Sequence, residues 1–193
     1  MKLRLSIIIY LFLLTPKIIF CQNNDISDSL EIDIEVVYDK LYHPAKTEVD
    51  YLFSGDSLLK NGKVKEAINF FTKIIAMNKY YLAPYLSRAR ALLIIGNIEA
   101  ATNDINFIFS RDNENPIAYD ILGDIHMERK AFKKAVKAYG KSLQIYPISK
   151  ELYYKRGQAY HNLGKYRYAC KDWSKAAKLG YNKASLILDK HCK

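Results

Sequence analysis

Four histidines and three cysteines are the side chains of this 193-residue chain that are best suited to metal binding or nucleophilic chemistry. No two histidines have the spacing by which one helix ligates zinc, and no glycine-rich phosphate-binding loop is present. Cys170 is the candidate nucleophile, but a buried or disulfide-bonded sulfur is inert. We therefore expect no catalytic residue, no bound metal and no cofactor.

The elements that position these side chains follow a 34-residue period. Two residue types recur in every period, the tyrosines Tyr51, Tyr85, Tyr119 and Tyr153 and the alanines Ala67, Ala101, Ala135 and Ala169. Between them stand small residues at one position, Gly55, Ala89, Gly123 and Gly157, and large apolar residues sixteen positions later, Phe71, Ile105, Tyr139 and Trp173. Small side chains let two helices approach, and large ones fill the space between them. The period therefore predicts four repeated helix pairs.

Turn residues separate the two predicted helices of each pair: Asn61 and Gly62, Gly96 and Asn97, Lys130, and Gly164. Pro116 opens the third unit, where a helix tolerates proline.

This pattern resembles the tetratricopeptide repeat (TPR) family over about residues 48–181. The third and fourth units follow the family pattern most closely, whereas the second has Ala89 in place of the usual glycine and Ile105 in place of the usual aromatic residue. The resemblance implies an all-α fold, a right-handed α-solenoid of four helix-turn-helix repeats (48–81, 82–115, 116–149 and 150–183) with a capping helix in 184–193. It also implies a non-enzymatic module that binds a protein or peptide partner.

In this family the first helices of the repeats line a concave groove. The corresponding positions predict a groove that is apolar in the first unit and polar in the last, with the candidate residues Leu52, Asp56, Leu86, Arg90, Asp120, Ile121, Asp124, Tyr154, Lys155 and Gln158. The lysine, asparagine and arginine set with which some members grip a peptide carboxylate is absent, so we do not expect that mode of binding. Two alternatives stay open for the apolar positions: they hold a peptide, or they pack against one another or against the segment that precedes the repeats.

Cys170 and Cys192 lie eleven residues on either side of Tyr181. If the last repeat helix and the capping helix (184–191, covering the last repeat with Leu186 and Ile187) form an antiparallel hairpin, both sulfurs reach the same level and can form a disulfide. The alternative is two free thiols. His126 and His161 lie at similar positions of neighbouring repeats and could approach each other, with a structural role as the expectation.

The segments before the repeats predict export. A basic start, an apolar run over residues 5–14 and a polar break form a signal peptide over residues 1–21. Cleavage after Cys21 leaves a periplasmic, envelope-associated or secreted protein with no membrane span. Lipidation of Cys21 is the alternative, although Phe20 is large for that motif. Residues 22–47 form an acidic leader that could dock onto the repeats.

Charge is distributed unevenly within the net +10. Residues 22–115 hold 10 basic and 14 acidic side chains, and residues 116–193 hold 17 and 6. Lysines at helical spacing in the second helices of repeats three and four predict a basic outer face: Lys130, Lys133, Lys134, Lys137, Lys141, Lys171, Lys175 and Lys178. This face is the alternative binding surface, suited to an anionic surface or polymer; because export separates the chain from nucleic acid, we do not expect a nucleic-acid partner.

Overall fold

The computed structural model describes residues 46–192. Over these residues the chain forms nine α-helices and no strand. Four pairs of helices are followed by a ninth: α3 (Lys46–Lys60) and α4 (Val64–Met77), α5 (Ala83–Ile94) and α6 (Ile98–Phe109), α7 (Pro116–Glu128) and α8 (Phe132–Ile145), α9 (Lys150–Asn162) and α10 (Tyr166–Lys178), and α11 (Asn182–His191). The expected all-α helical repeat solenoid is thus confirmed. The predicted signal peptide and nearly all of the acidic leader lie outside the described residues.

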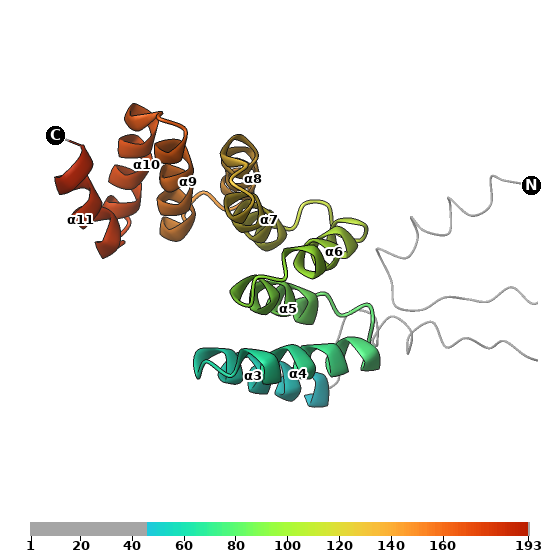
Figure 1. Cartoon of the computed structure of the whole chain (residues 1–193). Coiled ribbons are helices and arrows are strands. Elements are labelled where there is room, and N and C mark those ends of the chain that lie inside the picture. Colours follow the sequence, from blue (N-terminus) through green and yellow to red (C-terminus); the bar gives the residue numbers. More distant parts are fainter. Residues whose placement is uncertain (1–45, 193) are drawn as a thin grey trace, which may run out of the picture. The chain divides into compact units, whose positions relative to one another are not determined.

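Each helix packs against the next along the chain, and α5 also contacts the first helices of both neighbouring repeats, α3 and α7 (Figure 1). The second helices are strongly amphipathic, with one apolar face toward the first helices. The four repeated alanines each stand on the fourth residue of a second helix and are completely buried. The repeat period therefore marks the core of the described region.

Close helix crossings explain the small residues of the period. A Cβ atom built on Gly55 would lie 2.5 Å from the Phe71 ring, and one built on Gly157 would lie 2.5 Å from the Trp173 indole. In the second repeat the small residue is Ala89 and its partner is the slimmer Ile105, and both are buried. The larger the residue on the second helix is, the smaller the residue that it contacts on the first helix.

Local signals in the sequence set the helix ends. The side chains of Asn97, Asn115 and Ser149 each accept a hydrogen bond from a backbone N–H in the first turn of the following helix. Within three repeats the turn is made by a glycine with positive φ, namely Gly62, Gly96 and Gly164. In the third repeat Lys130 occupies the same place with φ of 54°.

The last helix closes the apolar end of the fourth repeat. Ala184 is buried and Ile187 packs on the cluster that contains Trp173, whereas Leu186, expected to cover the last repeat, is 73% exposed. Leu186 and Ile187 are neighbours on a helix and therefore point in different directions, so only one of them can face the repeat. A disulfide joins Cys170 of α10 to Cys192, which directly follows α11, with 5.7 Å between the Cα atoms.

Candidate protein-binding groove

A groove of about 540 Å³ lies against three consecutive repeats. Its walls come from α5, α7, α8 and α9, and the residues that line it are Arg90, Leu93, Ile94, Asp120, Asp124, Met127, Glu128, Tyr139, Lys155 and Gln158. First helices supply all of these residues except Tyr139, because one face of each first helix remains uncovered by its neighbours. The groove therefore joins surfaces that are far apart in the sequence.

Five of the ten predicted groove residues line this cavity: Arg90, Asp120, Asp124, Lys155 and Gln158. Tyr154 lies beyond them, where its hydroxyl accepts a hydrogen bond from Gln158 Nε2 at 3.3 Å. Asp56 is half-buried on α3 and does not line the cavity.

The predicted apolar groove residues belong to the interior. Ile121 has no exposed surface and is part of the core cluster around Ile105, so its assignment to the groove is wrong. Leu52 and Leu86 are half-buried and pack against the cores of the first and second repeats. Leu86 and Ile121 belong to one core cluster, as the alternative of mutual packing expected, and Leu52 belongs to another.

Lys155 organises the polar floor of the groove. Its ammonium nitrogen donates hydrogen bonds to Asp120 Oδ1 at 2.8 Å and to Asp124 Oδ2 at 2.7 Å, and thereby links α9 to α7. Tyr139 donates its hydroxyl proton to Asp124 Oδ1 at 2.7 Å. Arg90 of α5 lies 3.5 Å from the second oxygen of Asp120. One chain of charges and hydrogen bonds therefore ties three repeats together.

Burial and charge act in opposite directions on this network. Burial raises the pKa of Asp124, and the nearby Asp120 adds to that rise, while Lys155 opposes it. Burial alone would lower the pKa of Lys155, but the two carboxylates outweigh it and raise the pKa. The Tyr139 hydroxyl, buried and facing Asp124, has a strongly raised pKa, so it stays a hydrogen-bond donor. The lysine is thus neutralised within the protein and is not free to grip a peptide carboxylate.

Sequence reasoning missed Ile94, Glu128 and the polar role of Tyr139. Ile94 follows Arg90 by four residues and Glu128 follows Asp124 by four, so both continue the groove face by one helical turn. Extending the predicted stripe to the end of each first helix would have found them. The Tyr139 ring packs on Gly123 as predicted, and only the structure shows where its hydroxyl points.

Two bidentate ion pairs inside repeats were also missed. Arg88 donates to both oxygens of Asp104 at 2.9 and 2.6 Å, and Arg156 donates to both oxygens of Asp172 at 2.7 and 2.8 Å. The two pairs occupy identical positions of the second and fourth repeats. The matching 68-residue step of Arg and Asp in the sequence was the available signal.

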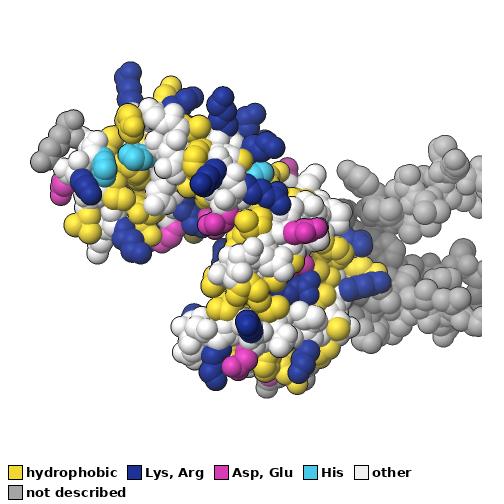
Figure 2. Space-filling model, in the orientation of Figure 1, with side chains coloured by type: hydrophobic (Ala, Val, Ile, Leu, Met, Phe, Trp, Pro, Cys, Tyr) yellow, Lys and Arg dark blue, Asp and Glu magenta, His cyan; other side chains and the backbone are white. Residues whose placement is uncertain are grey.

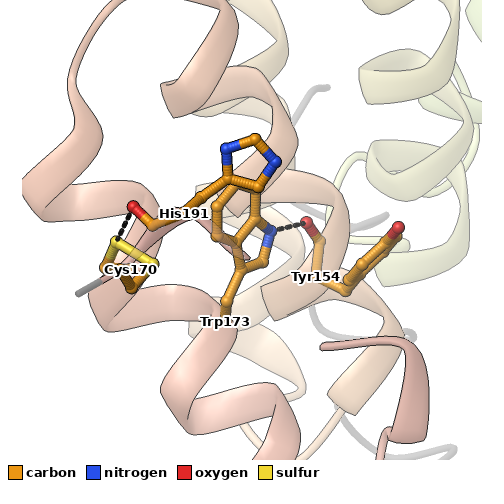
Figure 3. Close-up of a disulfide and its surroundings, with 5 residues drawn as sticks. Tyr154, Cys170, Trp173 and His191 are labelled. Atoms are coloured by element: carbon orange, nitrogen blue, oxygen red, sulfur yellow. Dashed lines mark hydrogen bonds between the residues drawn. A yellow bond between two sulfur atoms is a disulfide. The ribbon is translucent and has the colours of Figure 1, made fainter. Parts of the chain in front are cut away.

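A second cavity of about 220 Å³ continues from the groove toward the capping helix and shares Met127 and Gln158 with it. Trp173 forms part of its wall and donates its indole N–H to the Tyr154 carbonyl at 3.2 Å (Figure 3). The His161 ring contacts Trp173 and His191, with centroids 5.6 and 5.2 Å apart. Among the ring contacts of the described region, none joins His161 to His126, the pair that the sequence allowed to approach each other. Figure 3 shows the disulfide and the His191 carbonyl close to this aromatic cluster.

Within residues 46–192 no group of three or more His, Cys, Asp or Glu side chains is arranged to hold a metal ion. No helix in this described part is long and apolar enough to cross a bilayer.

Comparison with family models gives two matches, both in the second half of the chain. The model described as TPR repeat matches residues 123–164, and the model described as Tetratricopeptide repeat matches residues 150–179. A comparison with curated proteins gave no match.

Solved structures with the same fold are TPR proteins of low sequence identity. A thermophilic TPR protein of Thermus thermophilus, TTC0263, has a TM-score of 0.65 at 19% identity and covers 69% of this chain and 74% of its own. A MamA protein has a TM-score of 0.58 at 23% identity, with 78% and 79% covered. MamA of Desulfovibrio magneticus RS-1 has a TM-score of 0.59 at 16% identity, with 76% and 82% covered.

The solved structures show the fold. The two family matches identify repeats three and four as TPR repeats. The 34-residue period extends the same pattern to repeats one and two. TPR repeats are typical of non-enzymatic scaffolds for protein–protein interaction. The third and fourth repeats are tetratricopeptide repeats, and the described region has the fold of TPR proteins.

Proposed function

We propose that this protein is a non-enzymatic adaptor of the cell envelope or secreted fraction that holds a segment of a partner protein in the groove of α5, α7, α8 and α9. The observation that carries the proposal is the groove itself, which spans three repeats and has a floor already satisfied by internal hydrogen bonds. A preorganised surface loses little conformational entropy when a partner binds.

The groove combines two kinds of surface. Ile94 is 64% exposed at its edge, and Leu93 and Met127 add apolar area beside it. Glu128 is exposed, and within the described residues no cation lies within ion-pair distance of it. We expect a segment that places apolar side chains against Ile94 and a lysine or arginine near Glu128.

The envelope or secreted location rests on the predicted signal peptide of residues 1–21. An oxidising compartment is the usual setting for a disulfide such as Cys170–Cys192, which supports this location independently.

Crosslinking in the native exported fraction tests the proposal. Ile94→Asp should abolish the crosslinked partner, because it places a charge where apolar side chains bind. Ile148→Asp is the matched control: Ile148 is 63% exposed, close to the 64% of Ile94, but lies in the turn after α8 and outside the groove.

Retention of every partner by Ile94→Asp, or equal loss by both variants, would contradict groove binding. Leu86→Asp is unsuitable for this purpose, because Leu86 packs against the core and its replacement would destabilise the second repeat.

A further inference from the structure

The second helices of the last two repeats carry a second candidate surface, distinct from the groove. The same four repeat positions are basic or aromatic on both helices: Lys133, Lys134, Lys137 and Lys141 on α8, and Arg167, Tyr168, Lys171 and Lys175 on α10. We call these eight residues the basic face. All eight are exposed, and the buried residues of both helices lie on the opposite side.

Nothing in the described structure neutralises the basic face. None of its seven cations has a carboxylate within 4.0 Å among residues 46–192. Helix α8 contains no acidic residue, and the one acidic residue of α10, Asp172, is buried and paired with Arg156. The positive potential of this face is therefore directed at solvent.

The arrangement is a two-dimensional array of charge. On each helix the basic positions advance by four residues and so follow one side over about 12 Å. Helices α8 and α10 both pack against α9, which places the two rows on neighbouring repeats. Figure 2 shows Lys and Arg side chains gathered over the part of the molecule that carries α7 to α10.

The first two repeats lack this array. At the same positions α4 carries Lys65, Glu66, Asn69 and Lys73, and α6 carries Glu99, Ala100, Asn103 and Phe107. The charge is thus a property of repeats three and four and not of the repeat pattern.

We propose that the basic face docks onto an anionic phospholipid bilayer. Two rows of cations match a planar array of headgroups better than they match a single linear polyanion, and lysines near such a surface each strengthen binding. Tyr168, 56% exposed and on the same side as Lys171 and Lys175, has the amphipathic ring that favours the headgroup region. None of the residues that line the groove belongs to the basic face, so the protein can bind a bilayer and a protein segment at the same time.

Vesicle flotation tests this docking. The chain that begins at Gln22, after the predicted signal peptide, should bind vesicles that contain about 30% phosphatidylglycerol, and should not bind pure phosphatidylcholine. Binding should fall steeply as salt rises, because screening shortens the range of the attraction. Lys137→Gln with Lys171→Gln should weaken binding about 25-fold, or about fivefold per charge removed.

The matched control is Lys65→Gln with Lys73→Gln, which removes two exposed lysines from the corresponding positions of α4 and should leave binding unchanged. All forms begin at Gln22 and carry the same residues 22–45, so differences between them report the helices alone. Equal losses in both double variants would overturn the proposal. So would binding to soluble polyphosphate without binding to the anionic vesicles, since the surface would then serve a polymer. Loss of vesicle binding with the groove crosslink retained would separate this surface from the proposed adaptor function.

Discussion

The second repeat and the fourth repeat fold by the same packing rule but use different side chains. In the fourth repeat a glycine faces Trp173, and in the second an alanine faces Ile105, yet all four residues are buried in the same way. The family models match residues 123–164 and 150–179, within the third and fourth repeats, which use glycine and an aromatic ring as the first repeat does with Gly55 and Phe71. What the fold requires is a small residue that faces a larger one at the helix crossing. Residue types can change between repeats as long as these sizes match.

The first two repeats and the last two differ more in their surface residues, ion pairs and crosslinks than in their helix crossings. Repeats three and four carry the basic face, the Lys155 network and the disulfide to the capping helix. Repeats one and two lack the basic face and the disulfide, and they contribute only Arg90 of α5 to the Lys155 network. Replacing a residue of one repeat by the equivalent residue of another repeat can thus test which differences matter for stability.

The largest effect should come from breaking one internal ion pair. Asp172→Ala leaves the largely buried Arg156 without its carboxylate, and we expect it to lower the free energy of unfolding by about 3 kcal/mol. Adding Arg156→Leu recreates the third repeat, which has Leu122 and Ala138 at these positions, and should restore stability to within about 1 kcal/mol. Urea unfolding followed by circular dichroism measures both. A double variant as unstable as the single one would show that the pair itself is required.

The next largest effect concerns the helix crossing of the first repeat. Gly55→Ala places a methyl group 2.5 Å from the Phe71 ring and should cost about 2 kcal/mol. Together with Phe71→Ile it recreates the alanine and isoleucine of the second repeat, so the two changes should compensate by about 1 kcal/mol or more. Thermal and urea unfolding of the four proteins in this cycle give the coupling energy. Simple additivity would mean that the crossing distance is set elsewhere.

Residues with a fixed place in the period were predictable from the sequence. Ala67 to Ala169, the small and large crossing residues and the turns all depend on local size and backbone geometry, which recur every 34 residues. Arg156 and Asp172 also recur, but with a step of 68 residues, so a search for features common to all repeats overlooks them.

The groove was less predictable because it depends on how far neighbouring helices approach. The family positions identified Asp120, Asp124 and Lys155, but they could not show that these charges bind one another. Ile121 has the same place in its helix as the exposed Phe53, and only the packing between repeats decides which of the two is buried. The direction of a side chain depends only on its place in its own repeat. Its burial also depends on how closely the neighbouring repeat packs against it.

A smaller effect is expected at the turn of the third repeat. Lys130 has the positive φ that glycine adopts in the other three repeats, and a non-glycine residue there is strained. Lys130→Gly should therefore raise the free energy of unfolding by about 1 kcal/mol. Lys137→Gly, in the interior of α8, is the control and should lower it by a similar amount. Urea midpoints report both, and a destabilising Lys130→Gly would show that the lysine side chain contributes more than the strain costs.

The smallest effect should be a pH dependence that the first two repeats lack. The residues equivalent to His126 of the third repeat are Leu58 and Leu92 in the first two. The Nδ1 atom of His126 is buried without a hydrogen-bond partner in the described structure. Burial lowers the pKa of His126, and Lys134 and Arg129 lower it further. The folded state then binds its proton less readily than the unfolded chain, whose histidine has a pKa of about 6.5. Stability should fall as the pH drops below that value, because only the unfolded chain gains the proton.

His126→Leu recreates the first two repeats and should reduce this loss. The measurement is the urea midpoint at pH 7.5 and at pH 5.5 for both proteins, since groups common to both cancel in the difference. The native chain should lose more stability between the two pH values than the variant does. Equal losses would mean that His126 has the same pKa in the folded and the unfolded chain. The burial of Nδ1 would then have no energetic consequence. A larger loss in the variant would reverse the sign and show that the protonated ring finds a partner on folding.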